Sequence, residues 1–186
     1  MDKKEKIFDT ALKLFVKDGF HGTPTSKIAK EAGIANGTLF HHFKTKDILI
    51  KELYLKSKEE INDYIEEHIK GDLNPKTKFK ALYISSLNWS IDHSDKFQFI
   101  LLFQSSPFLK LIPQETLDQQ SQSYYKVLNE CYSKNLFTDL PLDYIYTLLL
   151  NHFMGNKEYI IQNSLSQEER KNLINTSFDL LWRMIS

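Results

Sequence analysis

The spacing of apolar residues predicts a chain built almost entirely of α-helices. Over most of the length, apolar positions recur at steps of three and four residues, which places them on one face of a helix. Ile7, Ala11, Leu14 and Phe15 form such a stripe between residues 3 and 18, and Gly19 follows as a helix-ending residue. Only 6 glycines and 5 prolines interrupt the 186 residues. We therefore expect the all-α class, with about nine helices.

Residues 23–43, TPTSKIAKEAGIANGTLFHHF, have the pattern of two short helices joined by a tight turn. Thr23 is the expected N-cap of the first helix, Pro24 its first residue, and Gly33 its end. Each helix has apolar residues at i, i+1 and i+4: Ile28, Ala29 and Ala32, then Leu39, Phe40 and Phe43. This arrangement predicts a helix-turn-helix, whose second helix enters the major groove of DNA.

The residues within this pattern resemble the DNA-binding signature of the TetR/AcrR family of bacterial transcriptional repressors. The resemblance lies in the run IAKEAGIANGTLFHHFKTKDIL, from Ile28 to Leu49, and in the upstream segment ALKLFVKDGFHGT. It covers residues 1–50 and fades beyond them. It implies an N-terminal three-helix DNA-binding head, a C-terminal helical body that binds a ligand and dimerises, and a homodimer on a double-stranded DNA operator.

Two positions depart from the family pattern. Ala35 stands where the family usually has a serine that caps the recognition helix, and Asn36 is the candidate to replace that cap. Phe40 stands where the family usually has a tyrosine whose hydroxyl contacts a phosphate. Phe40 cannot make this bond, so we expect its ring to pack inside the head.

The recognition helix is predicted to begin near Asn36, and Gly37 would let its backbone approach the DNA closely. The candidate contacts to base edges are Asn36, Thr38 and His41. The candidate contacts to phosphates are Thr25, Ser26, His42, Lys44 and Lys46. Two alternatives stay open, because Thr25 could only support a helix start and His42 could only pack on Phe43. Adjacent histidines cannot share one helix face, so no metal site is expected.

Charge is distributed unevenly, although the net charge of the chain is zero. Residues 1–46 contain 9 lysines and 5 acidic residues, and residues 47–186 contain 15 basic and 19 acidic residues. The head is thus positive, as phosphate binding requires, although lysine-rich faces are often only solvated. We expect a DNA-binding domain over 1–46 and a ligand-binding and dimerisation domain over 47–186, with residues 47–70 as a connecting helix capped by Thr45.

The expected body has helices over Pro75–Asp92, Asp95–Ser105 and Gln114–Lys134, one opened by Pro141, and one opened by a capping box at Ser166. Aromatic residues crowd these helices, which surround an effector pocket in the family. The candidate ligand-binding residues are Trp89, His93, Phe103, Tyr124, Tyr125, His152 and Phe153. They favour a small apolar or aromatic effector, because a charged one would need a fixed counter-charge. The alternative is that each aromatic ring is ordinary core.

The last two predicted helices carry an apolar stripe that recurs mostly at three- and four-residue steps. The candidate dimer-interface residues are Ile145, Leu149, Phe153, Tyr159, Ile160, Phe178, Leu181 and Ile185. Such a stripe either caps the core of its own chain or meets a second copy. The family resemblance implies the second arrangement, and a dimer suits two operator half-sites related by a two-fold axis.

Several other classes receive no support from the sequence. The single cysteine, Cys131, allows no internal disulfide and fits a cytoplasmic protein. The N-terminus begins like a helix rather than a signal peptide, and no apolar run approaches the ~20 residues that span a bilayer. We expect no cofactor and no catalytic residues. The leading interpretation is a ligand-responsive homodimeric repressor; the alternatives are a DNA-binding module without a ligand and a helical enzyme.

Overall fold

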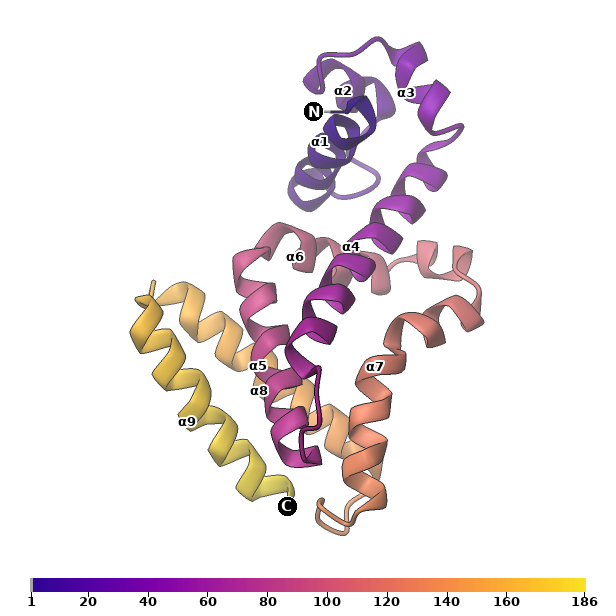
Figure 1. The fold of residues 1–186 in the computed structure, drawn as a ribbon. Helices are drawn as coiled ribbons and strands as arrows, with labels where there is room; N and C mark the ends of the chain where they lie inside the picture. Colours follow the sequence, from indigo (N-terminus) through magenta and orange to yellow (C-terminus); the bar gives the residue numbers. More distant parts are fainter. Residues whose placement is uncertain (1) are drawn as a thin grey trace. The chain divides into compact units, whose positions relative to one another are not determined.

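The computed structural model describes residues 2–186, and every regular element among them is helical (Figure 1). The α-helices are α1 (Lys3–Asp18), α2 (Thr25–Glu31), α3 (Asn36–His42), α4 (Lys46–Ile69), α5 (Pro75–Asp92), α6 (Ser94–Gln104), α7 (Gln114–Ser133), α8 (Leu142–Gln162) and α9 (Gln167–Ile185). A short 3₁₀ helix, η1 (Pro107–Leu111), follows α6. The all-α prediction is therefore confirmed over the described residues, and none of their helices is long and apolar enough to cross a bilayer.

Local chemistry explains where several helices begin or end. Gly19 follows α1 with a φ of 71°, a conformation that glycine adopts without strain. Thr45 and Asn74 each accept a hydrogen bond from the backbone amide three residues further along, at 3.2 and 3.0 Å. Ser166 and Glu169 form the predicted capping box at the start of α9. These short-range signals are readable from the sequence, because each one involves residues within one helical turn.

The starts of α2 and α3 differ from the prediction. Pro24, rather than Thr23, occupies the N-cap position of α2. The Thr23 side chain is fully buried, and its hydroxyl lies 2.8 Å from the carbonyl oxygen of Gly19 and 3.2 Å from that of Leu14. Thr23 therefore fastens the corner after α1. At α3, Ala35 is the N-cap and no side chain caps the helix.

Contacts divide the chain into two compact units, and the first comprises residues up to Glu60 together with His93–Gln120. It contains the helix-turn-helix, the first part of α4, and α6 with η1. The buried ring of Phe99 on α6 lies 6.1 Å from the ring of Phe15 and 5.9 Å from that of Phe20, centroid to centroid. The predicted boundary at residue 46 left α6 out of this unit, although these three rings belong to one apolar core.

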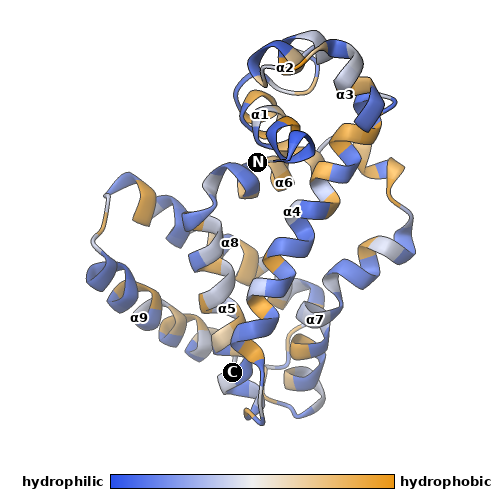
Figure 2. Ribbon diagram, turned by 45° about the horizontal axis from the view of Figure 1, so that its top comes forward, coloured by the Kyte–Doolittle hydropathy of each residue, from blue (hydrophilic) through white to orange (hydrophobic). Residues whose placement is uncertain are grey.

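The second unit comprises Ile61–Asp92 and Ser121–Ser186. Within it, α5 packs against both α8 and α9, which also pack on each other. The rings of Phe79 and Tyr83 on α5 lie 5.7 and 5.6 Å from the ring of Phe178 on α9, and Trp182 stacks 6.2 Å from Phe178. Hydrophobic and hydrophilic residues alternate along the ribbon of α9 (Figure 2). An aromatic cluster therefore lies where α5 meets α9.

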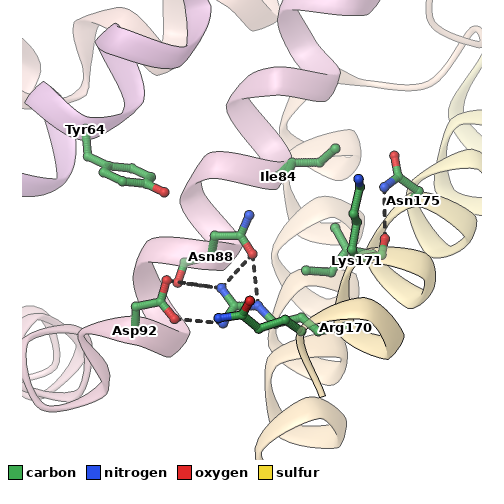
Figure 3. Close-up of a pocket in the computed structure, with 9 residues that line it drawn as sticks. Tyr64, Ile84, Asn88, Asp92, Arg170, Lys171 and Asn175 are labelled. Atoms are coloured by element: carbon green, nitrogen blue, oxygen red, sulfur yellow. Dashed lines mark hydrogen bonds and ion pairs between the residues drawn. The ribbon is translucent and has the colours of Figure 1, made fainter. Parts of the chain in front are cut away.

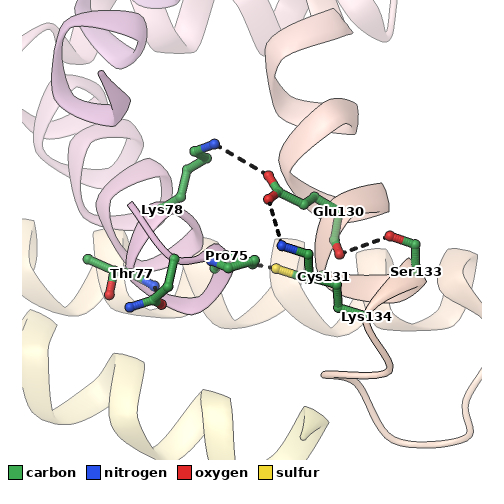
Figure 4. Close-up of polar contacts among 8 residues, drawn as sticks. Pro75, Thr77, Lys78, Glu130, Cys131, Ser133 and Lys134 are labelled. Atoms are coloured by element: carbon green, nitrogen blue, oxygen red, sulfur yellow. Dashed lines mark hydrogen bonds and ion pairs between the residues drawn. The ribbon is translucent and has the colours of Figure 1, made fainter. Parts of the chain in front are cut away.

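Polar contacts fix the end of α7 to the start of α5 (Figure 4). The carboxylate of Glu130 pairs with Lys78 and with Lys134, each at 3.3 Å. The hydrogen bond from Lys134, with that from Lys78, holds the pKa of Glu130 below its ordinary value. The Cys131 sulfur lies 3.6 Å from the carbonyl oxygen of Pro75, and burial raises the pKa of its thiol to about 11. Cys131 is therefore a neutral packing residue at physiological pH.

Candidate functional site

The exposed face of α3 is the candidate surface for reading DNA. Residues separated by four positions lie on the same face of an α-helix. Asn36 and Phe40 form one such exposed pair, and Gly37 and His41 form the next. Leu39, on the opposite side of the helix, is fully buried. Two of the three predicted base-reading residues, Asn36 and His41, therefore lie on the exposed face together with Gly37, and the third, Thr38, lies at the edge of the face, where it is half-buried.

Phe40 does not pack inside the head, contrary to the prediction. Its side chain is 41% exposed and lies on the same face as Asn36. The apolar pattern was misleading because Leu39 and Phe43, four residues apart, already supply the buried stripe of this short helix. Phe40 is offset from that stripe by about 100°. An apolar ring therefore belongs to the surface that was expected to be polar.

The α3 helix is held rigidly by the core of the head. The fully buried ring of Phe43 lies 5.2 Å from the ring of Phe8 on α1. On α2, the side chains of Ile28 and Ala29 are buried. An aromatic anchor at its C-terminal end and a buried leucine in its middle fix the rotation of α3 about its axis. The identity of the exposed residues is thus set by packing rather than by their own propensities.

The residues predicted to contact phosphates differ in how exposed they are and in whether they already bond within the protein. Ser26 and Lys44 are exposed, whereas Thr25 and His42 are half-buried. The Lys46 ammonium donates a hydrogen bond to the carbonyl oxygen of Phe20, and burial lowers the pKa of this ammonium. Lys46 thus ties the start of α4 to the corner after α1, which gives it a structural contact that the sequence did not indicate. Lys44 is the better placed of the two lysines for a phosphate.

Most of the predicted dimer-interface residues are instead buried inside their own chain. Six of the eight have less than 4% of their surface exposed: Ile145, Leu149, Ile160, Phe178, Leu181 and Ile185. The reason is that this stripe of α8 and α9 faces α5 within the second unit. The alternative stated for the pattern, a stripe that caps the chain's own core, therefore applies to these six. Tyr159 is exposed, and Phe153 is half-buried with its ring 6.2 Å from that of Tyr83.

A second set of apolar residues on α8 and α9 is exposed to solvent. Leu150 and Ile161 project from α8, and Leu180 and Met184 project from α9, where they are one turn apart. Leu180 is 58% exposed, whereas its neighbour Leu181 is 1% exposed. The two helices therefore each have an apolar side beyond the one that faces the core. We call Leu150, Ile161, Leu180 and Met184 the outer apolar set.

The predicted effector-binding residues are distributed over different environments. Phe103 is fully buried in the first unit, where its ring stacks 3.9 Å from that of Tyr54. Trp89 is buried in the second unit, and His93 is an exposed N-cap of α6. The two tyrosines, Tyr124 and Tyr125, form a cluster with Tyr146, with ring centroids 6.0 to 6.5 Å apart. Burial raises the pKa of Tyr124, so its phenol stays neutral.

His152 is held by neighbouring side chains rather than open to a ligand. Its two ring nitrogens lie 2.7 Å from the Tyr83 hydroxyl and 3.0 Å from the Ser177 hydroxyl. Asn156 completes the group, with its amide nitrogen 3.1 Å from the Tyr83 hydroxyl and its amide oxygen 2.7 Å from the Ser177 hydroxyl. An orienting contact from His152 to an effector would first have to break one of these bonds.

An open pocket of about 300 Å³ in the second unit lies at a different place from the predicted one (Figure 3). The Arg170 guanidinium crosses it, donating to the side-chain oxygen of Asn88 at 2.6 and 3.0 Å and pairing with Asp92 at 2.7 Å. Tyr64 and Ile84 add apolar surface to its walls. None of the predicted effector residues lines this pocket. Its central cation is already neutralised by Asp92, so its geometry is that of a structural ion pair.

Lys58 is a half-buried cation that the sequence reasoning missed. It lies on α4 one turn from Tyr54 and three residues from Ile61, both of which are buried. Burial lowers the pKa of its ammonium, and no acidic neighbour opposes that shift. Its spacing from these two buried residues could have indicated from the sequence that Lys58 is half-buried. A cation here could pair with an acidic group on a ligand, which the sequence interpretation had not provided for.

Comparison with known proteins identifies relatives over the whole chain. Residues 7–53 match the family profile of bacterial regulatory proteins of the tetR family. A helix-turn-helix transcriptional regulator of Bacillus subtilis, YerO, itself uncharacterised, is 33% identical over 167 residues, which cover 88% of this chain and 52% of that protein. This chain thus spans about half the length of the curated relatives it matches first.

Solved structures extend the similarity to the fold. A structure from Shewanella sp. PV-4, assigned to the tetR family of transcription regulators, is 28% identical with a TM-score of 0.80, and the match covers 100% of this chain and 98% of that one. The transcriptional regulator FadR of Bacillus subtilis, solved in complex with stearoyl-CoA, is 20% identical with a TM-score of 0.70, over 95% of this chain and 96% of that one. The second likeness concerns the fold alone.

Proposed function

This chain belongs to the TetR family of bacterial regulatory proteins, and we propose that it is a homodimeric transcriptional repressor that binds a palindromic operator. The observation that carries the proposal is the exposed face of α3, where Asn36, Gly37, Phe40 and His41 lie together on a rigidly held helix. Lys44 supplies an exposed positive charge just beyond that face. An α-helix presenting such a face is a suitable reader of a major groove.

Dimerisation through the outer apolar set would give the two heads that a palindrome requires. Four large apolar residues exposed on one pair of helices are expected to be covered in a stable protein. A second copy of the same chain is the simplest cover, because in a contact with two-fold symmetry the patch on each copy covers the same patch on the other. We place Leu180 and Met184 at the centre of this contact.

Selection from a randomised double-stranded DNA library tests the proposal directly. Purified protein should enrich sequences with two half-sites related by a two-fold axis, because each head of a dimer reads one half-site. The enriched duplex should bind less tightly as salt rises, since phosphate contacts release counterions. Enrichment of no sequence, or of single unpaired half-sites, would reject the proposed dimeric repressor. An enzyme with a helical active site would show the first of these results.

We further propose that an apolar effector weakens this binding by favouring a conformation with unsuitable head spacing. The aromatic residues of the second unit supply the apolar lining, and the FadR relative was solved with stearoyl-CoA bound. Because Trp89 is buried, an effector that reaches it must open the packing around its ring.

The effector proposal is tested with stearoyl-CoA and with neutral stearyl alcohol as probes. Each is titrated into the protein bound to its selected duplex, while release of the duplex and the fluorescence of Trp89 are followed in a Trp182→Phe background. Release and quenching over the same concentration range support the proposal. No release by either probe would favour a DNA-binding regulator that takes no apolar ligand of this class.

A further inference from the structure

Phe40 presents an apolar ring on the polar face of α3. Its side chain is 41% exposed, and its neighbours on that face are Asn36, one turn before it, and His41. The core of the head does not use the ring, because the fully buried side chains of Leu39 and Phe43 occupy the side of the helix that faces the core. The ring would leave water only when another molecule covers the face of α3.

The chemistry of the major groove limits what this ring could meet. The base edges there present hydrogen-bond donors and acceptors, together with one apolar group, the C5-methyl of thymine. A phenylalanine ring has no hydrogen-bonding group, so it gains nothing from a phosphate oxygen or from the polar edge of guanine. Burying a methyl group against a ring, in contrast, removes apolar surface of both partners from water.

We propose that Phe40 is a specificity-determining residue that packs on the C5-methyl group of one thymine in each operator half-site. This inference rests on the proposed DNA binding by α3. Asn36, on the same face, has the amide that pairs with the N6 and N7 edge of adenine. The face therefore favours a half-site that contains an adenine·thymine step, with the methyl group read by Phe40.

Replacing thymine by deoxyuridine tests the inference, because it removes the methyl group and leaves base pairing intact. In the duplex selected by the wild-type protein, each thymine of a half-site is replaced in turn, and dissociation constants are measured at fixed salt. One thymine in each half-site should matter, and its replacement should weaken wild-type binding about fourfold per methyl group. Phe40→Ala should bind the thymine duplex more weakly and should lose its sensitivity to that replacement.

Two matched variants keep the test sharp. Phe40→Tyr retains the ring, so it should remain sensitive to the same replacement. Phe40→Ala should keep the wild-type melting temperature, because the ring it removes is largely outside the core. A melting temperature lowered substantially by Phe40→Ala would overturn the inference, since the ring would then be structural.

The inference is also overturned if Phe40→Ala remains as sensitive as the wild type at every thymine, or if no thymine replacement affects the wild type. A uniform loss of affinity with a shallower salt dependence would overturn it too, because that is the signature of a backbone contact. Failure of the proposed DNA binding looks different, since the wild-type protein would then enrich no duplex. Loss of the inference alone leaves selective binding intact.

Discussion

The hydroxyl of Tyr83 on α5 lies 2.7 Å from Nδ1 of His152 on α8. This bond closes a ring of four side chains in which each donates to the next. The Ser177 hydroxyl donates to the amide oxygen of Asn156, the Asn156 amide donates to the Tyr83 hydroxyl, Tyr83 donates to His152, and Nε2–H of His152 donates to Ser177. The network thereby fixes a neutral His152 with its proton on Nε2.

We expect this ring of hydrogen bonds to make the stability of the second unit sensitive to acid. Burial lowers the pKa of His152 in the folded chain, whereas the pKa of histidine in an unfolded chain is about 6.5. The unfolded state therefore binds more protons, so stability is fully present above about pH 6.5 and falls as pH drops through the folded pKa. A proton on Nδ1 would also face the Tyr83 hydroxyl proton and break the ring.

The measurement is the free energy of unfolding in urea between pH 7.5 and 5, with His152→Gln as the control. The variant cannot take up the proton, so its stability should decline less steeply than that of the wild type. Parallel curves for the two proteins would show that His152 does not titrate between these pH values, which contradicts the account of the ring.

Leu180 and Leu181 provide an adjacent pair with opposite expected effects. Leu181 is buried in the core of its own chain, so Leu181→Ala should lower the free energy of unfolding by about 2–5 kcal/mol. Leu180 is exposed and belongs to the outer apolar set, so Leu180→Glu should leave a folded chain that sediments as a monomer. Tyr132→Glu, which removes an exposed ring on α7, is the control and should remain dimeric. A dimeric Leu180→Glu protein of unchanged stability would exclude the outer apolar set as the interface.

Replacing Gly37 by alanine should have opposite effects on the stability of the fold and on its affinity for DNA. A Cβ atom added at this position meets no heavy atom within 4 Å, so the protein tolerates alanine there. Replacing a helical glycine by alanine stabilises a fold by about 0.5–1 kcal/mol. On DNA the same methyl group would hold the backbone away from the base edges, and we expect an affinity loss of about tenfold or more. A Gly37→Ala protein that binds the selected duplex normally would remove α3 from the interface at this point.

The two lysines after α3 should differ in their response to salt. Lys44 is exposed and assigned to a phosphate, so Lys44→Ala should reduce the slope of log affinity against log salt by about one unit. Lys46 holds the carbonyl oxygen of Phe20, so Lys46→Ala should lower the melting temperature and change the slope little. The opposite pattern, a changed slope with full stability for Lys46→Ala, would restore the phosphate role expected from its sequence position.

The helix boundaries were predictable from the sequence wherever the residues that set them lie within one helical turn of each other. The cap at Asn74, the capping box at Ser166 and the glycine after α1 each act on residues close by in the chain. The sequence also indicated the α3 face at Asn36, Gly37 and His41, because the buried stripe defines its opposite side.

Predictions that depended on distant residues were less successful. The α9 helix is apolar at both Leu180 and Leu181, and only the packing of α5 decides which of them is buried. Phe40 looked like core because it follows a buried leucine, but the helix was already filled by Phe43. The grouping of α6 with the head depends on Phe99, which is distant in sequence from the two rings it meets.

The central claim is that α3 reads a specific DNA sequence, and fluorescence anisotropy with two duplexes tests it most directly. One labelled duplex carries the selected operator and the other carries the same bases in scrambled order, and both are titrated with wild-type protein at physiological salt. If α3 reads the sequence, the operator binds at least about 10³-fold more tightly than the scrambled duplex. Equal affinity for the two duplexes would contradict this claim.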